Sequence, residues 1–199
     1  MLDYVQAAFW SLTYVFLIIY AIKFKRHGIP LASICLNFAW ETVALGQSLM
    51  MGEFTGSLIV HIAWFSLDLV ILLLFLFCET PEPKVKWKKW IFLISYVCSS
   101  VLLMFVFSKG YMLLSCFVID LIMAVDFIVF VLFRRVKKHW ISYVIGGSKL
   151  IGDMCAWLFY RDAFSINFIG SIVLLCNLVY VSILLCKPND QGLLCTDPI

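Results

Sequence analysis

The chain has 199 residues, of which 64% are hydrophobic and only 14% are charged. A soluble globular domain carries about 45–50% apolar and about 25% charged residues, so this composition excludes a soluble domain, a disordered chain and a secreted disulfide scaffold. The mean hydropathy is +1.03, and the net charge is only +3. The sequence therefore predicts an integral membrane protein that is embedded in the lipid bilayer and has no nucleic-acid partner.

Seven long apolar runs follow one another along the chain. A membrane-spanning α-helix needs about 20 mostly apolar residues. The runs lack the alternation, in segments of about ten residues, that is typical of a β-barrel. We therefore predict an all-α polytopic protein, a seven-helix transmembrane bundle that forms a single domain over residues 1–187, with a short tail at 188–199. The expected spans are roughly 6–22, 30–51, 57–77, 88–108, 111–133, 140–160 and 165–186.

The basic residues orient the predicted bundle. Most of them follow the first span, separate spans three and four, separate spans five and six, or follow the seventh span. The positive-inside rule places these segments in the cytoplasm, so the N-terminus is expected outside and the C-terminus in the cytoplasm. No basic segment precedes the first span, which we interpret as an uncleaved helix rather than a signal peptide. The topology-determining residues are Lys23, Lys25, Arg26, Lys84, Lys86, Lys88, Lys89, Arg134, Arg135, Lys137, Lys138 and Lys187.

The common catalytic and metal-binding motifs are missing from the sequence. The eight cysteines show no CxxC or Cys/His spacing that indicates a metal site, and we interpret them as small apolar fillers. No HExxH, GxSxG or Walker A motif occurs, and no DDxxD motif is present to bind a diphosphate through metal ions. The sequence therefore predicts neither a metal nor a cofactor.

Polar side chains inside the spans are the candidates for a functional site. An ionisable residue at the centre of a membrane helix costs about 2.5–3.5 kcal/mol on insertion scales. The second span carries Asn37 and Glu41 four residues apart, and therefore on one helical face. The third span carries a similar face, and the later spans add further polar residues near the bilayer centre. The full set is Asn37, Glu41, His61, Asp68, Asp120, Asp126, Lys149, Asp153 and Asn177.

Most of these polar residues also have a structural interpretation. Lys149 and Asp153 can neutralise each other across one helical turn, and Asn177 can join two helices through a hydrogen bond. Glu41 is harder to explain in this way, because it lies near the bilayer centre with no basic residue on its own helix. Two residues nearer the boundaries of the spans also have structural interpretations. Asp126 can pair with cytoplasmic arginines, and His61 can be an interfacial side chain.

Two motifs carry a resemblance to a known family. The second span contains Asn37-Phe38-Ala39-Trp40-Glu41, an N-x-x-W-E pattern, and the third contains Trp64-Phe65-Ser66-Leu67-Asp68. A seven-span chain of this length with these motifs resembles the integral membrane terpene cyclases of fungal meroterpenoid and indole-diterpene pathways, and their bacterial relatives. The resemblance covers the seven-span layout and most of the chain.

The resemblance implies a reaction without a metal. A membrane-embedded acid protonates the terminal epoxide or alkene of a linear prenyl chain, and the carbocation closes rings until proton loss or water quenches it. Glu41 stands at the position of the family's candidate acid in the second helix. The family's second acid is expected in the last helix, where this chain has Asn177, so Asp68 or Asp153 is a candidate for that role.

The chemistry of the residues agrees with this expectation. A proton donor must be a neutral acid at neutral pH, and apolar surroundings favour the neutral form of a carboxyl. Asn37 is placed to hydrogen-bond and orient such a carboxyl. Aromatic faces stabilise a carbocation by about 2 kcal/mol or more when they are desolvated. The candidate substrate-binding residues are therefore Asn37, Trp40, Trp64, Phe65, Asp120, Trp157 and Asn177, and the candidate catalytic residues are Glu41, Asp68 and Asp153.

Two other functions fit an intramembrane layer of acids. A proton-coupled or small-solute transporter uses such residues, and a non-catalytic scaffold or receptor-like bundle is a third interpretation. Transporters often show repeats and broken helices, but none of the five prolines lies in the middle of a span. We therefore predict a terpene cyclase-like enzyme with a hydrophobic prenyl substrate that enters from the bilayer. A closed apolar cavity with Glu41 at one end favours this function, whereas a water-filled path favours transport.

Overall fold

The computed structural model describes residues 2–25, 29–52, 56–77, 88–133 and 139–186. These residues confirm the predicted all-α architecture. Six of the seven helices begin and end within one residue of the expected spans. The first helix extends further at both ends, because backbone hydrogen bonding continues past the apolar stretch that predicted it. The helices are α1 (Leu2–Phe24), α2 (Leu31–Met51), α3 (Gly56–Phe77), α4 (Lys88–Ser108), α5 (Met112–Phe133), α6 (Trp140–Tyr160) and α7 (Phe164–Cys186).

The helices differ in how apolar they are. Among the described helices, α1, α3, α4, α5 and α7 are long and apolar enough to cross a membrane. Two helices are less apolar because of the polar residues that they bury, which include Asn37 and Glu41 in α2 and Lys149 and Asp153 in α6. The chain is an integral, multi-pass membrane protein. Passage of α2 and α6 through the bilayer and the orientation of the termini stay predictions.

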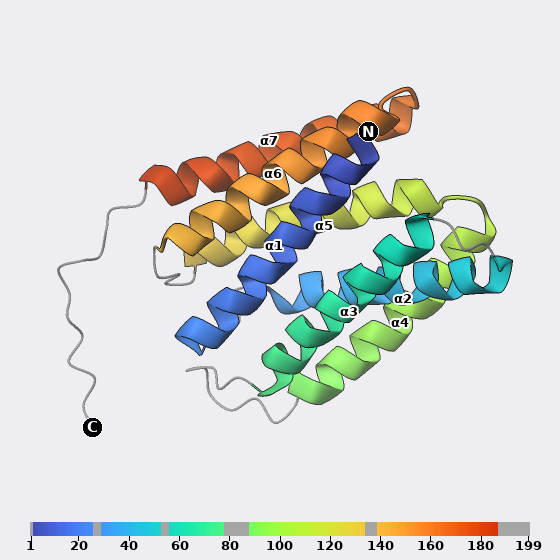
Figure 1. The fold of residues 1–199 in the computed structure, drawn as a ribbon, viewed down its shortest axis with the longest axis horizontal. Helices are drawn as coiled ribbons and strands as arrows, with labels where there is room; N and C mark the ends of the chain where they lie inside the picture. The colour runs from blue at the N-terminus through green and yellow to red at the C-terminus, as the bar shows by residue number, and fades with distance from the viewer. Residues whose placement is uncertain (1, 26–28, 53–55, 78–87, 134–138, 187–199) are drawn as a thin grey trace.

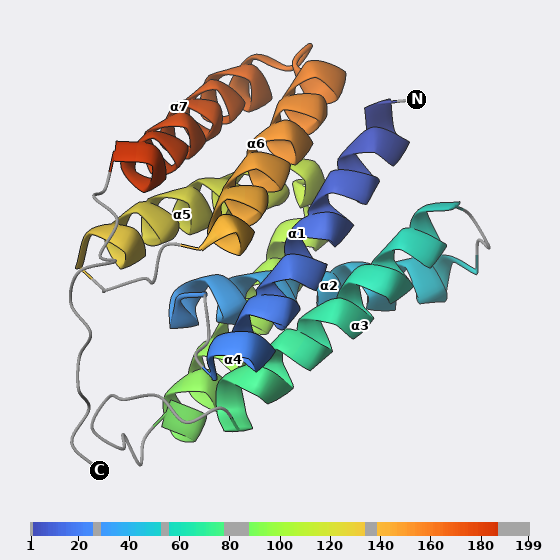
Figure 2. The same cartoon turned by 60° about the vertical axis from the view of Figure 1, so that its left-hand side comes forward.

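The helix α1 lies between two groups of three helices (Figure 2). On one side it packs against α6, which packs against α7, and α7 in turn packs against α5. On its other side α1 packs against α3, which packs against α2, and α2 packs against α4. Contacts of α5 with α2 and α4 join the two groups. The interior between the groups is therefore enclosed by α1, α2, α3 and α5.

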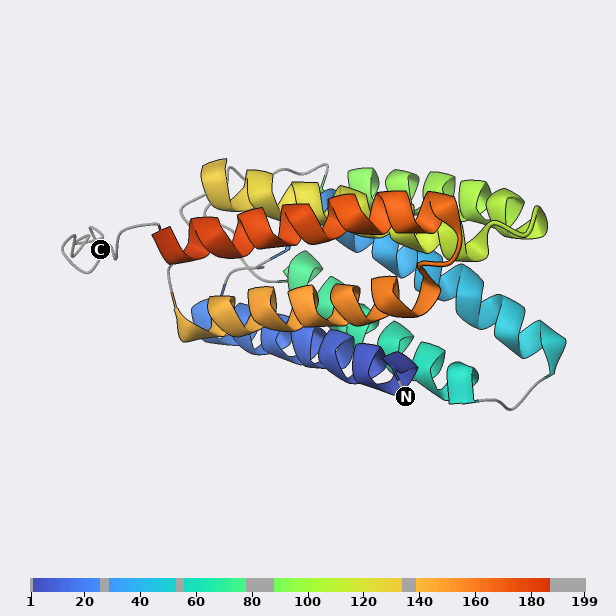
Figure 3. The same cartoon turned by 90° about the horizontal axis from the view of Figure 1, so that it is seen from above.

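Consecutive helices run in opposite directions, as their short connections predict. The odd-numbered helices end, and the even-numbered helices begin, toward the left in Figures 1 and 3. At this end the indoles of Trp90 and Trp140 are 66% and 57% exposed, and Lys23 Nζ lies 3.1 Å from His139 Nε2. The remaining basic residues predicted for this end lie mostly outside the described residues, as does the tail at 188–199.

Asp126, on α5, is a half-buried carboxyl near the same end. Ser33 Oγ on α2 donates a hydrogen bond to Asp126 Oδ2 at 3.0 Å. The arginines expected to pair with this carboxyl, Arg134 and Arg135, lie outside the described residues. Asp126 thus joins α5 to α2.

Candidate functional site

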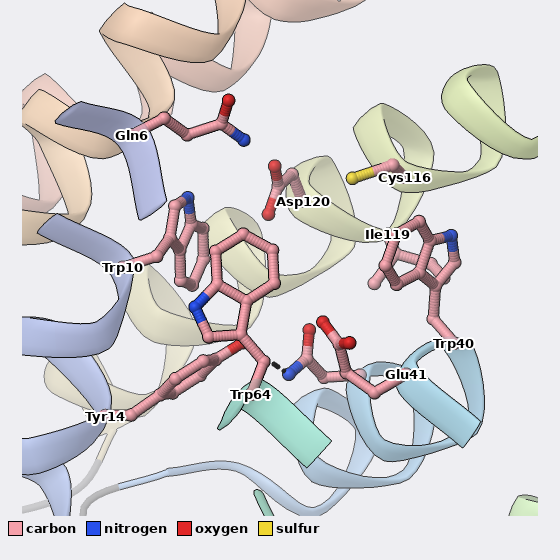
Figure 4. Close-up of a pocket in the computed structure, with 10 residues that line it drawn as sticks. Gln6, Trp10, Tyr14, Trp40, Glu41, Trp64, Cys116, Ile119 and Asp120 are labelled. Carbon is pink, nitrogen blue, oxygen red and sulfur yellow. Dashed lines mark hydrogen bonds between the residues drawn. The ribbon is translucent and has the colours of Figure 1, made fainter. Parts of the chain in front are cut away.

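A pocket opens where α1, α2, α3 and α5 come together (Figure 4). The space between its walls, together with the open solvent at its mouth, amounts to about 370 Å³. Three indoles, two carboxyls and a few smaller groups form its walls. The lining residues are Gln6, Trp10 and Tyr14 of α1, Asn37, Trp40 and Glu41 of α2, Trp64 of α3, and Cys116, Ile119 and Asp120 of α5.

Two carboxyls face each other across this pocket. Glu41 reaches into it from α2 and Asp120 from α5 (Figure 4). Glu41 is 2% exposed and Asp120 is 7% exposed. Glu41 Oε2 lies 3.3 Å from His61 Nδ1, whereas the carboxyl of Asp120 has no hydrogen bond with any of the described residues. The pocket therefore contains two carboxyls, and of these only Glu41 has a hydrogen-bond partner among the described residues.

His61 is the partner of Glu41. It is 9% exposed, and its ring centroid lies 5.7 Å from that of Trp40 and 6.3 Å from that of Trp64. The sequence analysis interpreted His61 as an interfacial side chain; the structure buries it against Glu41 and Trp40 of α2. In the tautomer with the proton on Nδ1, His61 donates to Oε2, and Oε1 of Glu41 is left to carry an acidic proton.

Asn37 links three helices beside the pocket. Its Nδ2 donates to Asp68 Oδ2 at 2.6 Å and to Tyr14 Oη at 2.8 Å. The sequence placed this amide as the partner of Glu41, but the structure directs its nitrogen to Asp68. Asp68 is 5% exposed and lies behind Asn37, outside the pocket lining.

Two of the three indoles are held by their N–H groups. Trp40 Nε1 donates to Ser115 Oγ at 3.2 Å, and Trp64 Nε1 donates to Ser11 Oγ at 3.1 Å. These bonds connect α2 to α5 and α3 to α1. Because the polar edge of each ring is bonded to a neighbouring helix, both rings are fixed beside the two carboxyls (Figure 4).

The comparison with protein families agrees with these observations. Residues 1–161 match the profile of the Pyr4-like transmembrane terpene cyclases. The chain belongs to this family. The matched region contains α1 to α6, and thus every residue that lines the pocket, but it ends before α7. No curated protein and no solved structure matches the chain.

Membership of the terpene cyclase family confirms the resemblance that the two motifs predicted. It implies a hydrophobic terpenoid substrate and a bilayer environment, and it does not favour transport. Within the described residues, no group of three or more His, Cys, Asp and Glu side chains is arranged to hold a metal ion.

This cyclase-family chain has a second buried polar cluster, on α6 and α7. Lys149 Nζ and Asn177 Nδ2 each donate to Asp153 Oδ2 at 2.6 Å, and all three side chains are at most 2% exposed. The structural interpretation of these residues, an ion pair across one turn and an interhelical hydrogen bond, is confirmed. None of the three lines the pocket.

The cluster touches the pocket wall at Trp10. Lys149 Nζ lies 4.7 Å from the centroid of the Trp10 ring. Gly152 makes this packing possible, because a Cβ at that position would lie 2.9 Å from Trp10 Cδ1. Trp10 therefore separates the ion pair from the pocket.

Two aromatic residues of the predicted site lie elsewhere in the terpene cyclase fold. Phe65 stacks on Phe38 with ring centroids 5.2 Å apart. Trp157 Nε1 donates to Asn167 Oδ1 at 2.9 Å, and its ring packs so closely on Gly170 that a Cβ there would lie 2.5 Å from Trp157 Cδ1. Neither residue lines the pocket.

The first helix supplies a wall that the sequence analysis did not identify. Gln6, Trp10 and Tyr14 are spaced by four residues, so they share one face of α1. This pattern of polar and aromatic residues at helical spacing was a usable signal. The hydrophobicity that predicts a membrane span does not indicate which face of the helix lines a pocket.

Proposed function

We propose that this chain cyclises a linear prenyl substrate by protonating its terminal epoxide or alkene, with Glu41 as the proton donor and without a metal. The observation that carries the proposal is the position of the Glu41 carboxyl, which is 2% exposed and opens onto a pocket lined by three indoles. With an epoxide, Glu41 protonates the oxygen, the C–O bond breaks, and the nearby double bonds attack the resulting carbocation.

The surroundings of Glu41 suit this chemistry. In the low-dielectric interior a carboxyl favours its neutral form, which is the form that can donate a proton. The indoles of Trp40 and Trp64 offer aromatic faces to a carbocation. The ring of Trp10 is a weaker candidate, because the Lys149 ammonium already lies 4.7 Å from its centroid.

The second acid of the reaction is open to direct test. Asp68 and Asp153 are the candidates from the sequence. Asp68 is joined to the pocket through Asn37, whereas Asp153 is bonded to Lys149 and Asn177. Asp68→Asn and Asp153→Asn, each assayed for turnover and for melting temperature, separate a role in the reaction from a role in folding.

The orientation of the bundle forms part of the proposal. The basic segments place the N-terminus outside and the C-terminus in the cytoplasm. Cysteines introduced at His27 and Lys137 should react with a membrane-impermeant maleimide only after the membrane is permeabilised. Labelling of both positions from outside intact cells would contradict this orientation.

The activity can be tested with membranes that contain the full chain. The probes are the terminal epoxides of farnesol and geranylgeraniol, supplied in the presence of EDTA, and membranes without the chain are the control. We expect cyclic products by gas chromatography and mass spectrometry. Failure to cyclise either epoxide, or conversion only when divalent metal is restored, would contradict the proposal.

A further inference from the structure

The pocket has a second carboxyl besides that of Glu41. Among the residues that line it, Glu41 and Asp120 are the two carboxyls, and they enter from different helices on opposite walls (Figure 4). A cyclisation that begins with protonation and ends in an alkene needs a donor at the start and a base at the end. The two opposed carboxyls are suited to these two steps.

We infer that Asp120 is the base that ends the cyclisation, an inference that rests on the function proposed above. Its carboxylate removes a proton from the carbon next to the final cationic centre. The electron pair of the broken C–H bond forms the product alkene, and the proton is bound to a carboxylate oxygen of Asp120. The reaction leaves Glu41 without its proton and Asp120 with one, so a proton must return to Glu41 before the next turnover.

The other buried aspartates are less available for this step. Asp68 accepts a hydrogen bond from Asn37 at 2.6 Å, and Asp153 Oδ2 accepts two hydrogen bonds at 2.6 Å. Neither residue lines the pocket. Asp120 does line it, and no hydrogen bond from the described residues competes for its oxygens.

Asp120 shares its wall of the pocket with an apolar side chain and a thiol. Ile119 and Cys116 lie beside it on α5; Ile119 offers no nucleophile to the cation, whereas the sulfur of Cys116 does. A carbocation in the pocket adds positive charge, which favours the carboxylate form of Asp120. This is the form that can accept a proton from the cation.

The first test compares the products of two isosteric variants of α5. Asp120→Asn keeps the shape of the side chain but cannot accept the proton, while Asp126→Asn makes the same change at a residue outside the pocket. With the farnesol epoxide, we expect the alkene fraction of Asp120→Asn to fall at least about tenfold, in favour of alcohols or mixed isomers. Asp126→Asn should keep the parent alkene. An unchanged product mixture in folded Asp120→Asn, or an alcohol as the only product of the parent, would overturn the inference.

The second test asks which carboxyl carries the negative charge, and it needs no turnover. The probe is dimethylfarnesylamine, an ammonium at neutral pH that resembles a prenyl carbocation, and farnesol is its neutral control. Asp120→Asn should bind the amine at least about tenfold more weakly than the parent, because it removes one partner of a buried charge pair. Glu41→Gln and Asp126→Asn should bind it as the parent does.

The outcomes of the binding test separate the two claims. Equal affinity of the parent and Asp120→Asn for the amine would contradict the role of Asp120. Loss of affinity in Glu41→Gln instead would reverse the assignment of acid and base. A parent that binds the amine through Asp120 but cyclises neither epoxide would contradict the proposed function.

Discussion

The bundle buries two groups of charged side chains that differ in their partners. On α6 and α7, Lys149 and Asn177 both donate to Asp153 at 2.6 Å. In the pocket, Glu41 has only His61 within hydrogen-bonding distance among the described residues, and Asp120 has no such partner there. The first group pairs its charges away from the pocket, although Asp153 Oδ1 has no hydrogen bond, whereas the second faces the pocket. Burial alone therefore does not identify a catalytic acid, because the partners decide whether a carboxyl is free to exchange a proton.

The largest effect on stability is expected from breaking the group of Lys149, Asp153 and Asn177. Lys149→Met leaves the Asp153 carboxylate buried without its cation, which costs about 3–5 kcal/mol. The melting temperature in detergent should therefore fall clearly below that of the parent. The double variant Lys149→Met with Asp153→Leu removes both charges and should recover most of the loss. A single variant that melts like the parent would show that the ion pair is not structural.

A smaller effect, on turnover, is expected from removing an aromatic face of the pocket. Trp64→Leu keeps an apolar side chain but loses cation–π attraction of about 2 kcal/mol, which corresponds to about thirtyfold in rate. Trp157→Leu is the matched control, because that indole lies outside the pocket lining. Product formation per folded protein is the measurement. Equal losses in the two variants would show that the pocket wall has no special role.

The smallest effect is expected at the contact between the two regions. In Gly152→Ala the new methyl would lie 2.9 Å from Trp10 Cδ1, and such overpacking costs about 1 kcal/mol or more. Gly147→Ala is the control on the same helix, because its methyl would meet nothing within 4 Å. Thermal melting should show Gly152→Ala below the parent and Gly147→Ala at or above it. The reverse order would contradict the packing of Trp10 on α6.

The sequence predicted the helices closely and the pocket only in part. Long apolar runs fix where helices form, and the expected depth of Glu41 follows from its position along the predicted second span. Sequence periodicity does not reveal how each helix is rotated toward its neighbours. For this reason the sequence allowed Lys149 to pair with Glu41 or with Asp153, and the structure pairs it with Asp153. The pairing of His61 with Glu41 likewise depends on how α3 packs against α2.

The candidate substrate-binding residues show the same limit. Trp40, Trp64 and Asp120 line the pocket, whereas Trp157 was expected to join them and packs against α7 instead. All four lie on helices that the sequence located correctly. Which of them share a cavity depends on the order of the helices around the bundle, and that order is a property of tertiary packing.

The central claim is that Glu41 gives the proton that starts the reaction, and the turnover of Glu41→Gln tests it most directly. Glutamine keeps the shape, and its amide can accept a hydrogen bond from His61 or donate one to it, so the melting temperature should stay near that of the parent. Turnover of the prenyl epoxide per folded protein should fall at least about 10²-fold, the lower end of general acid contributions, while Asp126→Asn stays close to the parent. Full activity of Glu41→Gln on an epoxide that the parent cyclises would contradict the account.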